Sequence, residues 1–472
     1  MRLTTLDNLD VGAGRLYRWP VRIDGDGEAH PVGPSENERF HLDAVAAGGS
    51  GWLAVTFEID SGELPILRAA FEAVLRHHEV LRAWFVLDDG VPQRRLCPPS
   101  ALTVHEPTAV DVPDPDGAKA RIGDAVIGGC SALTPGSHLL AAVDHGATST
   151  VVCAFDHCYI DAHSLAVIVE DVRTACAGDP LTAAGGFLDQ QADVAVADEP
   201  AEDDPRVVAW GDFLAAADWT IPQYPLDLGV APGEFAPARI RVDTVLSAAE
   251  AWALTTPATD LAGPIRCYPA LLAALAVATR RLGGPSRLPL VIPVHTRRDD
   301  RWSRSVGWFV ANAPLILTGG CDGVADPCVD PARAVEYAVR SATETLHDAL
   351  PLGEVELSTV YRTFGHRLRK PRHDVFMVSY LDYRRFDLPE RLDAHHVSSD
   401  GRADTLQMWF WRDHTGVHLR TRHPDTPTAR SVVTAVVDDL IDLVRGLAVS
   451  PTERAVPDRV GTDATPAGHR AG

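Results

Sequence analysis

The chain has 472 residues, of which 46% are hydrophobic and 23% charged, a composition typical of a soluble globular protein with room for two cores. Its net charge of −22, from 43 basic and 65 acidic side chains, argues against nucleic acid or an anionic membrane as the main partner. The sequence contains neither an apolar signal core nor an apolar run of membrane-spanning length, so we expect a cytoplasmic protein.

The first 147 residues alternate predicted helices and strands. Ser35 and Glu38 form a capping box that opens a helix at SENERFHL. Residues 53–59 alternate in polarity, which predicts a half-buried strand. After Pro65, apolar residues recur at helical spacing up to Leu75. Residues 100–147 are rich in Ala, Gly and Pro, with a strand predicted near 138–143.

Residues 148–175 contain several polar and ionisable side chains between a predicted strand and a predicted helix. TSTVVCAF is apolar and β-branched, which predicts a buried strand, and LAVIVEDVRTA has the apolar spacing of an amphipathic helix. Polar and ionisable side chains lie between them: Asp156, His157, Asp161, His163 and Ser164. An imidazole on such a turn is held rigidly and can still reach a cavity, as a general base requires.

The cysteines and histidines of the chain do not predict a metal site. The eight cysteines are scattered, as in a cytoplasmic protein with reduced thiols. His145, Cys153, His157, Cys158 and His163 are close in sequence, but neither CxxC nor HExxH spacing occurs there.

The second half of the chain begins after a segment, 178–205, whose Gly, Ala, Asp, Glu and Pro content predicts a linker. Pro269 opens an apolar, buried helix that Gly283–Gly284 ends. PLVIPVHTRRDDRW predicts a strand that enters a basic loop, and SVGWFVANAPLIL follows. DVFMVSYLDY predicts a strand, and TLQMWFWRDHTGVHLRTRH predicts a hairpin with a DHTG turn.

The last predicted helix starts at Thr426–Pro427, and the polar sequence after Pro451 predicts a disordered tail. We therefore divide the chain into an N-terminal lobe at 1–180, a linker at 181–205, a C-terminal lobe at 206–449 and a tail at 450–472.

Four segments, in order, resemble one superfamily. HCYIDA resembles the HxxxDG core of the HHxxxDG motif of condensation domains, polyketide-associated acyltransferases and chloramphenicol acetyltransferase. RHHEVLRAWFV, PALLAALAVATRRLGG and SVGWFVANAPLIL resemble other segments of condensation domains. Two positions depart from the motif: Asp156 stands at its first histidine, and Ala162 replaces its glycine.

The resemblance implies an α/β fold of two chloramphenicol acetyltransferase-like lobes, a V-shaped pseudo-dimer with mixed sheets and a tunnel between the lobes. It implies that His157 is the active-site histidine and Asp161 a structural aspartate, with an arginine across the lobes as its partner. We favour Arg297 over Arg298 for that pairing. Asp156, Arg297, Trp308 and Asn312 are the candidates for substrate contacts. An aromatic residue on a strand is more often part of the core, so Trp308 could either line the channel or pack inside. Asn312 is the better candidate for a polar contact near the tunnel, because a buried amide must find partners.

The function implied is a free-standing condensation-type acyltransferase of secondary metabolism. It would move an acyl group from an acyl or peptidyl carrier protein or from coenzyme A to a small-molecule hydroxyl or amine, with no permanently bound cofactor, as a monomer. Two alternatives stay open. One is a non-catalytic recruitment domain of this fold. The other is a heterocyclization-type enzyme, because Asp156, Asp161 and Ser164 fit the pattern DxxxxDxxS.

Overall fold

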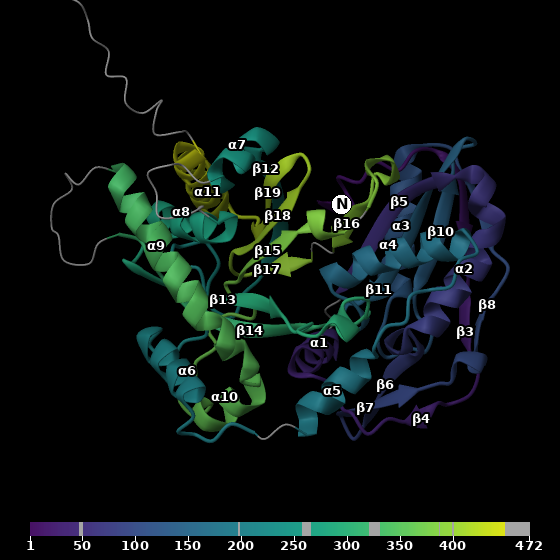
Figure 1. Ribbon diagram of the computed structural model, residues 1–472, viewed down its shortest axis with the longest axis horizontal. Coiled ribbons are helices and arrows are strands. Elements are labelled where there is room, and N and C mark those ends of the chain that lie inside the picture. Colours follow the sequence, from purple (N-terminus) through teal and green to yellow (C-terminus); the bar gives the residue numbers. More distant parts are fainter. Residues whose placement is uncertain are drawn as a thin grey trace, which may run out of the picture.

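The computed structural model describes residues 1–46, 51–196, 199–256, 266–320, 331–386, 388–398 and 401–448. Figure 1 shows two lobes side by side, each built around its own sheet and covered by helices. Within the described ranges, no helix is both long enough and apolar enough to cross a bilayer. The predicted tail at 450–472 lies outside the described residues.

The N-terminal lobe is organised around a seven-stranded sheet with the order β1-β16-β5-β11-β10-β2-β9. Its strands are β1 (Arg2–Thr5), β2 (Gly14–Arg18), β5 (Trp52–Asp60), β9 (Thr108–Val112), β10 (Leu139–Asp144), β11 (Thr148–Asp156) and β16 (His395–Ser398). The β1–β16 pair is parallel and β11 pairs antiparallel with both of its neighbours, so the sheet is mixed, as predicted.

Helices cover both faces of this sheet. On one face lie α2 (Leu64–His77) and α4 (Ala162–Cys176), which share a core with β5 and β11. On the other face lies α3 (Pro115–Gly129), which packs against β10 and β9. Because β5 is central and covered on both sides, nearly all of its residues are buried. The prediction that this strand is only half-buried was therefore wrong.

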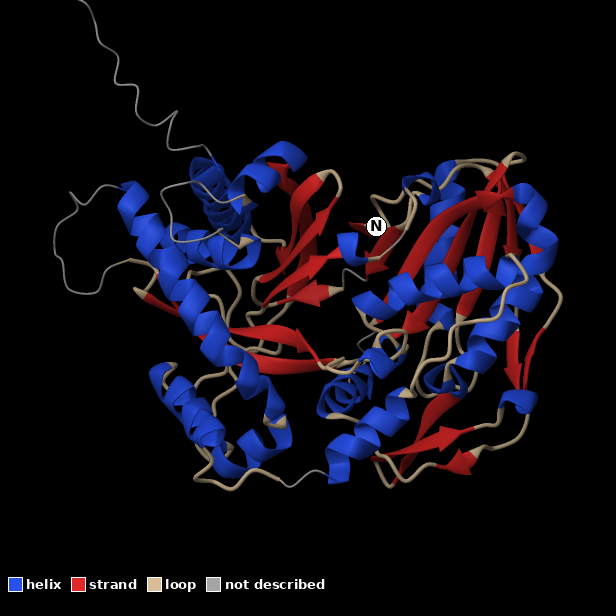
Figure 2. Cartoon of the chain, in the orientation of Figure 1, coloured by secondary structure: helices blue, strands red, loops and turns tan. Residues whose placement is uncertain are grey.

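Short elements complete the N-terminal lobe (Figure 2). They are β3 (Val21–Ile23), β4 (Glu28–Ala29), α1 (Glu36–Ala46), β6 (Ala83–Asp88), β7 (Val91–Leu96), β8 (Leu102–Val104) and α5 (Phe187–Val196). The predicted capping box at the start of α1 is present: Ser35 N donates to Glu38 Oε2 at 2.7 Å, and Glu38 N donates to Ser35 Oγ at 3.3 Å.

The C-terminal lobe has a five-stranded sheet with the order β15-β18-β19-β12-β17. Its strands are β12 (Ala236–Ser247), β15 (Val378–Asp382), β17 (Arg402–Ala403), β18 (Gln407–Asp413) and β19 (Gly416–Pro424). The predicted hairpin is the β18–β19 pair, and the predicted buried helix is α8 (Cys267–Arg281), which packs with α7 (Ala248–Thr255) and α11 (Pro427–Ala448). Thr426 Oγ1 caps α11, as the sequence predicts, by accepting from Ala429 N at 2.9 Å.

A long hairpin runs from the C-terminal lobe toward the N-terminal one (Figure 1). It consists of β13 (Arg287–His295) and β14 (Val310–Thr318), with α9 (Pro331–Ala349) packed along it. Below it, α6 (Pro205–Ala216) and α10 (Leu357–Phe364) form a small separate core. The loop between β13 and β14 places Trp302, Val306 and Phe309 in the core of the N-terminal lobe.

The two lobes exchange segments, which corrects the predicted boundaries. Strand β16 comes from the range assigned to the C-terminal lobe, yet it lies between β1 and β5 in the N-terminal sheet. The predicted linker at 181–205 contains α5, whose Phe187 and Leu188 are buried in the N-terminal core. A contiguous division at residues 180 and 206 therefore does not describe the packing.

The segment RHHEVLRAWFV is structural, as the resemblance implies. His78 Nε2 lies 2.8 Å from Asp171 Oδ2, and Glu79 Oε1 accepts from Leu188 N at 2.8 Å. Arg82 is buried and donates to the carbonyl oxygen of Cys97. These contacts join the end of α2 to α4 and α5.

Candidate active site

The strand, turn and helix predicted at 148–175 are β11, the short 3₁₀ helix η4 (His157–Tyr159) and α4. A carboxylate caps each helical start. Asp156 Oδ1 accepts from Cys158 N at 2.9 Å, and Asp161 Oδ1 accepts from Ser164 N at 2.8 Å. Side-chain caps of this kind satisfy amides that have no partner within the helix. His157 is therefore held between two fixed carboxylates.

His157 lies where the two halves of the chain meet. Its side chain is partly exposed, and its backbone N–H donates to Gly51 O at 3.1 Å. Its ring stacks on Trp308, from the loop before β14, with 3.9 Å between centroids and 27° between planes. Nδ1 is buried and finds no hydrogen-bond partner in the part of the chain that the structure describes.

The environment of His157 disfavours a charged ring. Burial is the main cause that lowers the pKa of His157 to about 4, and the nearby His41 imidazole acts in the same direction. The ring's own backbone carbonyl, Asp156 and Asp161 act in the opposite direction but do not overcome it. The imidazole is therefore uncharged at neutral pH.

Asp161 and Arg297 form the ion pair that the sequence led us to expect. Arg297 Nη1 donates to Asp161 Oδ2 at 2.7 Å, and Nη2 donates to Asp161 Oδ1 at 3.0 Å. Nη2 also reaches Ser164 Oγ at 2.8 Å and the Ser305 carbonyl at 3.1 Å. Arg298, the less favoured candidate, is exposed and pairs with Glu354 instead.

This ion pair is almost completely buried, and its geometry sets the charge of Asp161. Burial alone would raise the pKa of Asp161, but the Arg297 guanidinium and its hydrogen bonds hold it at about 2. The backbone N–H of Phe309 donates to Asp161 Oδ2 at 3.1 Å. Arg297 thus holds Asp161, which caps the helix that follows His157. A direct contact between Arg297 and substrate stays a prediction.

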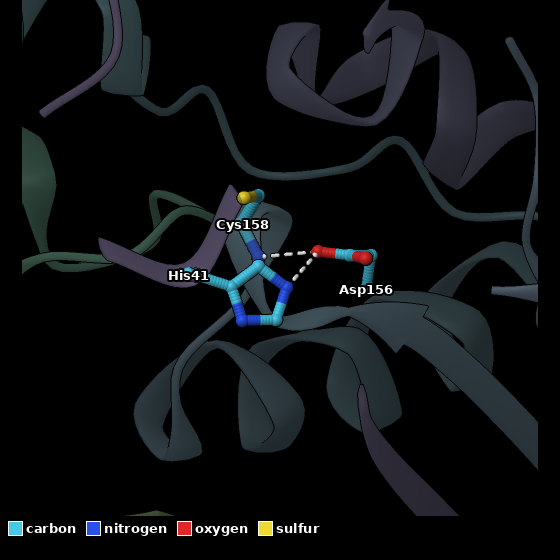
Figure 3. A group of neighbouring side chains, drawn as sticks. All are labelled: His41, Asp156 and Cys158. Atoms are coloured by element: carbon cyan, nitrogen blue, oxygen red, sulfur yellow. Dashed lines mark hydrogen bonds and ion pairs between the residues drawn. The ribbon is translucent and has the colours of Figure 1, made fainter. Parts of the chain in front are cut away.

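Asp156 is held in place by a histidine that the sequence analysis did not consider. Figure 3 shows His41, from α1, beside Asp156 and Cys158, with His41 Nε2 2.9 Å from Asp156 Oδ1. Asp156 Oδ2 accepts from Ala132 N at 3.1 Å. The carboxylate is buried and engaged on both oxygens, so a contact between Asp156 and substrate also stays a prediction.

The ligand atoms of His41, Asp156 and Cys158 lie within 4.8 Å of one another, which is close enough to consider a metal ion. The donor chemistry does not favour one. Burial raises the pKa of the Cys158 thiol well above its usual value, whereas a metal ligand must be a thiolate. Asp156 Oδ1 already accepts from the Cys158 amide. The His41 ring and the Cys158 amide both lie close to this oxygen.

Trp308 and Asn312, the predicted contacts from the second lobe, have different surroundings. Trp308 is partly buried, and its ring covers one face of the His157 imidazole. The Asn312 side chain donates through Nδ2 to Asn37 Oδ1 at 2.9 Å, and Asn37 Nδ2 donates to Val310 O at 2.7 Å. These bonds fasten α1 to β14. Substrate contacts by Trp308 and Asn312 stay predictions.

The polar groups at the start of α4 bond to other parts of the protein. Ser164 is a buried first-turn residue, and its hydroxyl bonds Asp161 and Gly307 as well as Arg297. The amides of Ser164 and Leu165 donate to Asp161, so they do not serve an oxyanion. His163 is partly buried, and its Nε2 lies 2.9 Å from the Ser303 carbonyl oxygen.

A second histidine missed at the sequence level is His396, on β16. It is buried, and its Nδ1 lies 2.8 Å from the Tyr383 hydroxyl. The position of His396 in the N-terminal sheet could not be predicted, because residues 206–449 were all assigned to the C-terminal lobe. His41 carried a signal: it follows Glu38 by three residues and precedes Leu42 on the buried stripe of α1. Polar residues on such a stripe need partners.

Similar proteins point to one class. No protein-family model matches the chain. The acyltransferase PapA3 of Mycobacterium tuberculosis is 24% identical over 412 residues, 83% of each chain. The trehalose-2-sulfate acyltransferase PapA2 of the same species is 24% identical over 460 residues, 91% of this chain and 94% of PapA2.

Solved structures agree with the sequence relatives. A PapA2 acyl transferase structure superposes with a TM-score of 0.81 at 22% identity, covering 95% of this chain and all of that one. The first condensation domain of the calcium-dependent antibiotic synthetase gives 0.64 at 16% identity, covering 90% and 98%.

The chain therefore has the fold of the condensation-domain and chloramphenicol acetyltransferase-like superfamily, and it is an acyltransferase. Within that superfamily it is homologous to PapA2 and PapA3.

Proposed function

We propose that the chain transfers an acyl group from a thioester to a hydroxyl group, with His157 as the general base, in secondary metabolism. The observation that carries the proposal is the position of the His157 imidazole, partly exposed where the two lobes meet and stacked on Trp308. Its lowered pKa supports the proposal, because an uncharged ring can accept a proton. A hydroxyl is favoured over an amine because PapA2 is named for acylating a sugar sulfate, trehalose-2-sulfate. The donor is a phosphopantetheinyl carrier protein or coenzyme A.

In this mechanism, a proton on the buried Nδ1 of His157 leaves Nε2 free to accept another. Nε2 takes the acceptor's hydroxyl proton while the oxygen attacks the thioester carbonyl. The tetrahedral intermediate then collapses, the carbon–sulfur bond breaks, and the thiolate receives that proton. A base positioned in this way contributes about 10²–10⁴-fold to the rate. Asp161 and Arg297 hold the helix that follows the base and take no proton.

The pattern DxxxxDxxS does not favour cyclization in this setting. Asp156 is engaged by backbone amides and by His41, and Asp161 and Ser164 are engaged by Arg297. None of the three is placed as a free acid or base. The retained, uncharged His157 supports acyl transfer over both cyclization and a purely recruiting role.

The experiment compares wild type with His157→Ala, using palmitoyl-coenzyme A or a palmitoyl-loaded carrier protein as donor and trehalose as acceptor. Mass spectrometry follows the ester product and the loss of acyl group from the carrier. We expect transfer by wild type and a loss of at least about 100-fold in His157→Ala. His347→Ala is the matched control, because His347 is on α9 with its side chain 87% exposed.

The outcomes separate the rival functions. Equal rates for wild type and His157→Ala would refute the assigned base. Binding of the loaded carrier that is the same in both proteins, with no product from wild type across a panel of sugars and long-chain alcohols, would indicate a recruitment domain.

A further inference from the structure

The motif lacks its first histidine in the sequence, but the fold brings an imidazole beside the carboxylate that stands at that motif position. Asp156 occupies that motif position, and His41 reaches it from α1, with His41 Nε2 2.9 Å from Asp156 Oδ1 (Figure 3). The centroids of the His41 and His157 rings are 6.2 Å apart. His41 also meets Trp308 edge-on at 6.0 Å. His41, His157 and Trp308 thus form one cluster of rings.

The His41–Asp156 pair is attached directly to the backbone that carries His157. Asp156 joins three segments: β11, where it ends the strand, η4 through the Cys158 amide, and the loop before β10 through the Ala132 amide. A buried carboxylate with this many donors fixes its surroundings. Any movement of Asp156 would therefore move the turn on which His157 lies.

The packing of His41 against Gly51 strengthens this link. A Cβ atom added at Gly51 would lie 2.6 Å from His41 Cε1 and 3.0 Å from Nδ1, so the imidazole is in close contact with the glycine backbone. The Gly51 carbonyl oxygen accepts the backbone N–H of His157 at 3.1 Å. The His41 ring therefore touches the very peptide that holds the base.

We propose that His41 is a positioning residue for His157: with Asp156 it fixes the turn that carries the base, and it supplies the second imidazole beside it. The proposal rests on His157 being the base of the proposed function. Among the described residues, His41 is the histidine bound to the carboxylate at the first motif position.

The same arrangement has an electrostatic consequence. The charged and titratable groups around His157 are His41 on α1, Asp156 at the end of β11, Asp161 with its partner Arg297, and His396 on β16. After burial, His41 is the strongest influence that lowers the pKa of His157, while both carboxylates raise it. Removal of the His41 imidazole should therefore let the His157 ring take up a proton at higher pH.

The test is the pH dependence of kcat/KM for His41→Gln and His41→Ala, with palmitoyl-coenzyme A and trehalose as probes or with whichever pair wild type turns over. The acid limb of wild type should have its midpoint at about 4, the pKa of His157. In both variants we expect the midpoint to move to higher pH, because the His41 imidazole lowers the pKa of His157. We also expect kcat to fall more than KM changes, with Gln, which can still donate to Asp156, less affected than Ala.

Several results would overturn the proposal. A rate lowered equally at every pH, with an unmoved acid limb, would mean that His41 is merely structural. An unchanged rate in His41→Ala would mean that it has no role. His347→Gln serves as the control and should keep the wild-type profile.

An exchange variant covers the case in which single substitutions unfold the protein. His41→Asp combined with Asp156→His keeps an imidazole–carboxylate pair with its members reversed. The exchange should recover thermal stability and activity relative to Asp156→His alone, where two imidazoles face each other. No recovery in the exchange variant would contradict the pairing.

Failure of this inference is distinguishable from failure of the proposed function. If His157→Ala is inactive while the His41 variants keep the wild-type pH profile, only the role of His41 is wrong. If His157→Ala is active, the proposed base itself is wrong.

Discussion

The two carboxylates that flank His157 are both buried, yet their partners differ in kind. Asp161 is bound by two nitrogens of Arg297, which crosses from the second half of the chain and keeps its charge at any practical pH. Asp156 is contacted by His41, an imidazole from the same lobe, and by two backbone amides. One carboxylate is therefore held by an arginine from the other half of the chain, and the other by groups within the N-terminal lobe.

The two carboxylates fix the same turn to different parts of the fold. The Asp161 side ties the two lobes together, because Arg297, Ser305, Gly307 and Phe309 all reach α4 or its cap from the β13–β14 loop. The Asp156 side ties the turn to α1 within the N-terminal lobe. The position of His157 therefore depends on contacts between the lobes on one side and on contacts within the N-terminal lobe on the other.

The largest effect is expected at the carboxylate held by Arg297. Arg297→Ala removes the only cation bonded to Asp161 among the described residues and leaves a buried charge unpaired. We expect the free energy of unfolding to fall by about 3–5 kcal/mol, measured by urea titration at pH 7. Arg298→Ala, which breaks only an exposed ion pair with Glu354, is the control and should cost less than about 1 kcal/mol. Equal, small losses in both variants would contradict the comparison.

A smaller effect is expected in how the unfolding free energy depends on pH, because His157 and Asp161 titrate in different pH ranges. The pKa of His157 is about 4 in the folded chain and about 6.5 in an unfolded one, so the unfolded state binds the proton first as pH falls. His157 therefore destabilises the protein progressively between pH 6.5 and pH 4. Asp161, with a pKa lowered to about 2, loses its stabilising contribution mainly below its unfolded value of 3.8, and so changes little in that window.

His157→Gln should remove this acid sensitivity. The unfolding free energy of His157→Gln is compared with that of wild type at pH 7 and at pH 4. We expect this difference to shift by about 1–3 kcal/mol in favour of the variant between pH 7 and pH 4. Urea titrations at the two pH values measure it. A constant difference between the two proteins would show that the pKa of His157 is not lowered by folding.

The smallest effect is expected where α1 meets the second lobe. Asn312→Ala removes its hydrogen bond to Asn37, one of the two that fasten α1 to β14. We expect a loss of about 0.5–1.5 kcal/mol in unfolding free energy. A double-mutant cycle with Asn37→Ala checks that the energy belongs to this pair. Additive losses would show that the two amides act independently.

The sequence predicted most of what depends on local pattern. Apolar spacing gave the buried face of α2, from Leu67 to Leu75, and the strand-turn-helix around His157. The resemblance to condensation domains led to the Arg297–Asp161 pair, although 136 residues separate the two.

The features that could not be predicted depend on tertiary contacts between residues that belong to no common sequence motif. His41 meets Asp156 only because α1 packs beside η4, and no spacing between the two residues records this. Strand β16 joins the N-terminal sheet although its neighbours in sequence lie in the other lobe. Helix α3 was missed because its many Ala and Gly residues give only a weak amphipathic pattern.

The most direct test of the central claim is a titration of the His157 ring by NMR in protein labelled at histidine Cε1. The His157 signal is assigned by its absence from the spectrum of His157→Gln, since the chain has 19 histidines. We predict a midpoint of about 4, so that the ring is uncharged and able to accept a proton at neutral pH. A midpoint at the ordinary histidine value of about 6.5, or above it, would contradict the account.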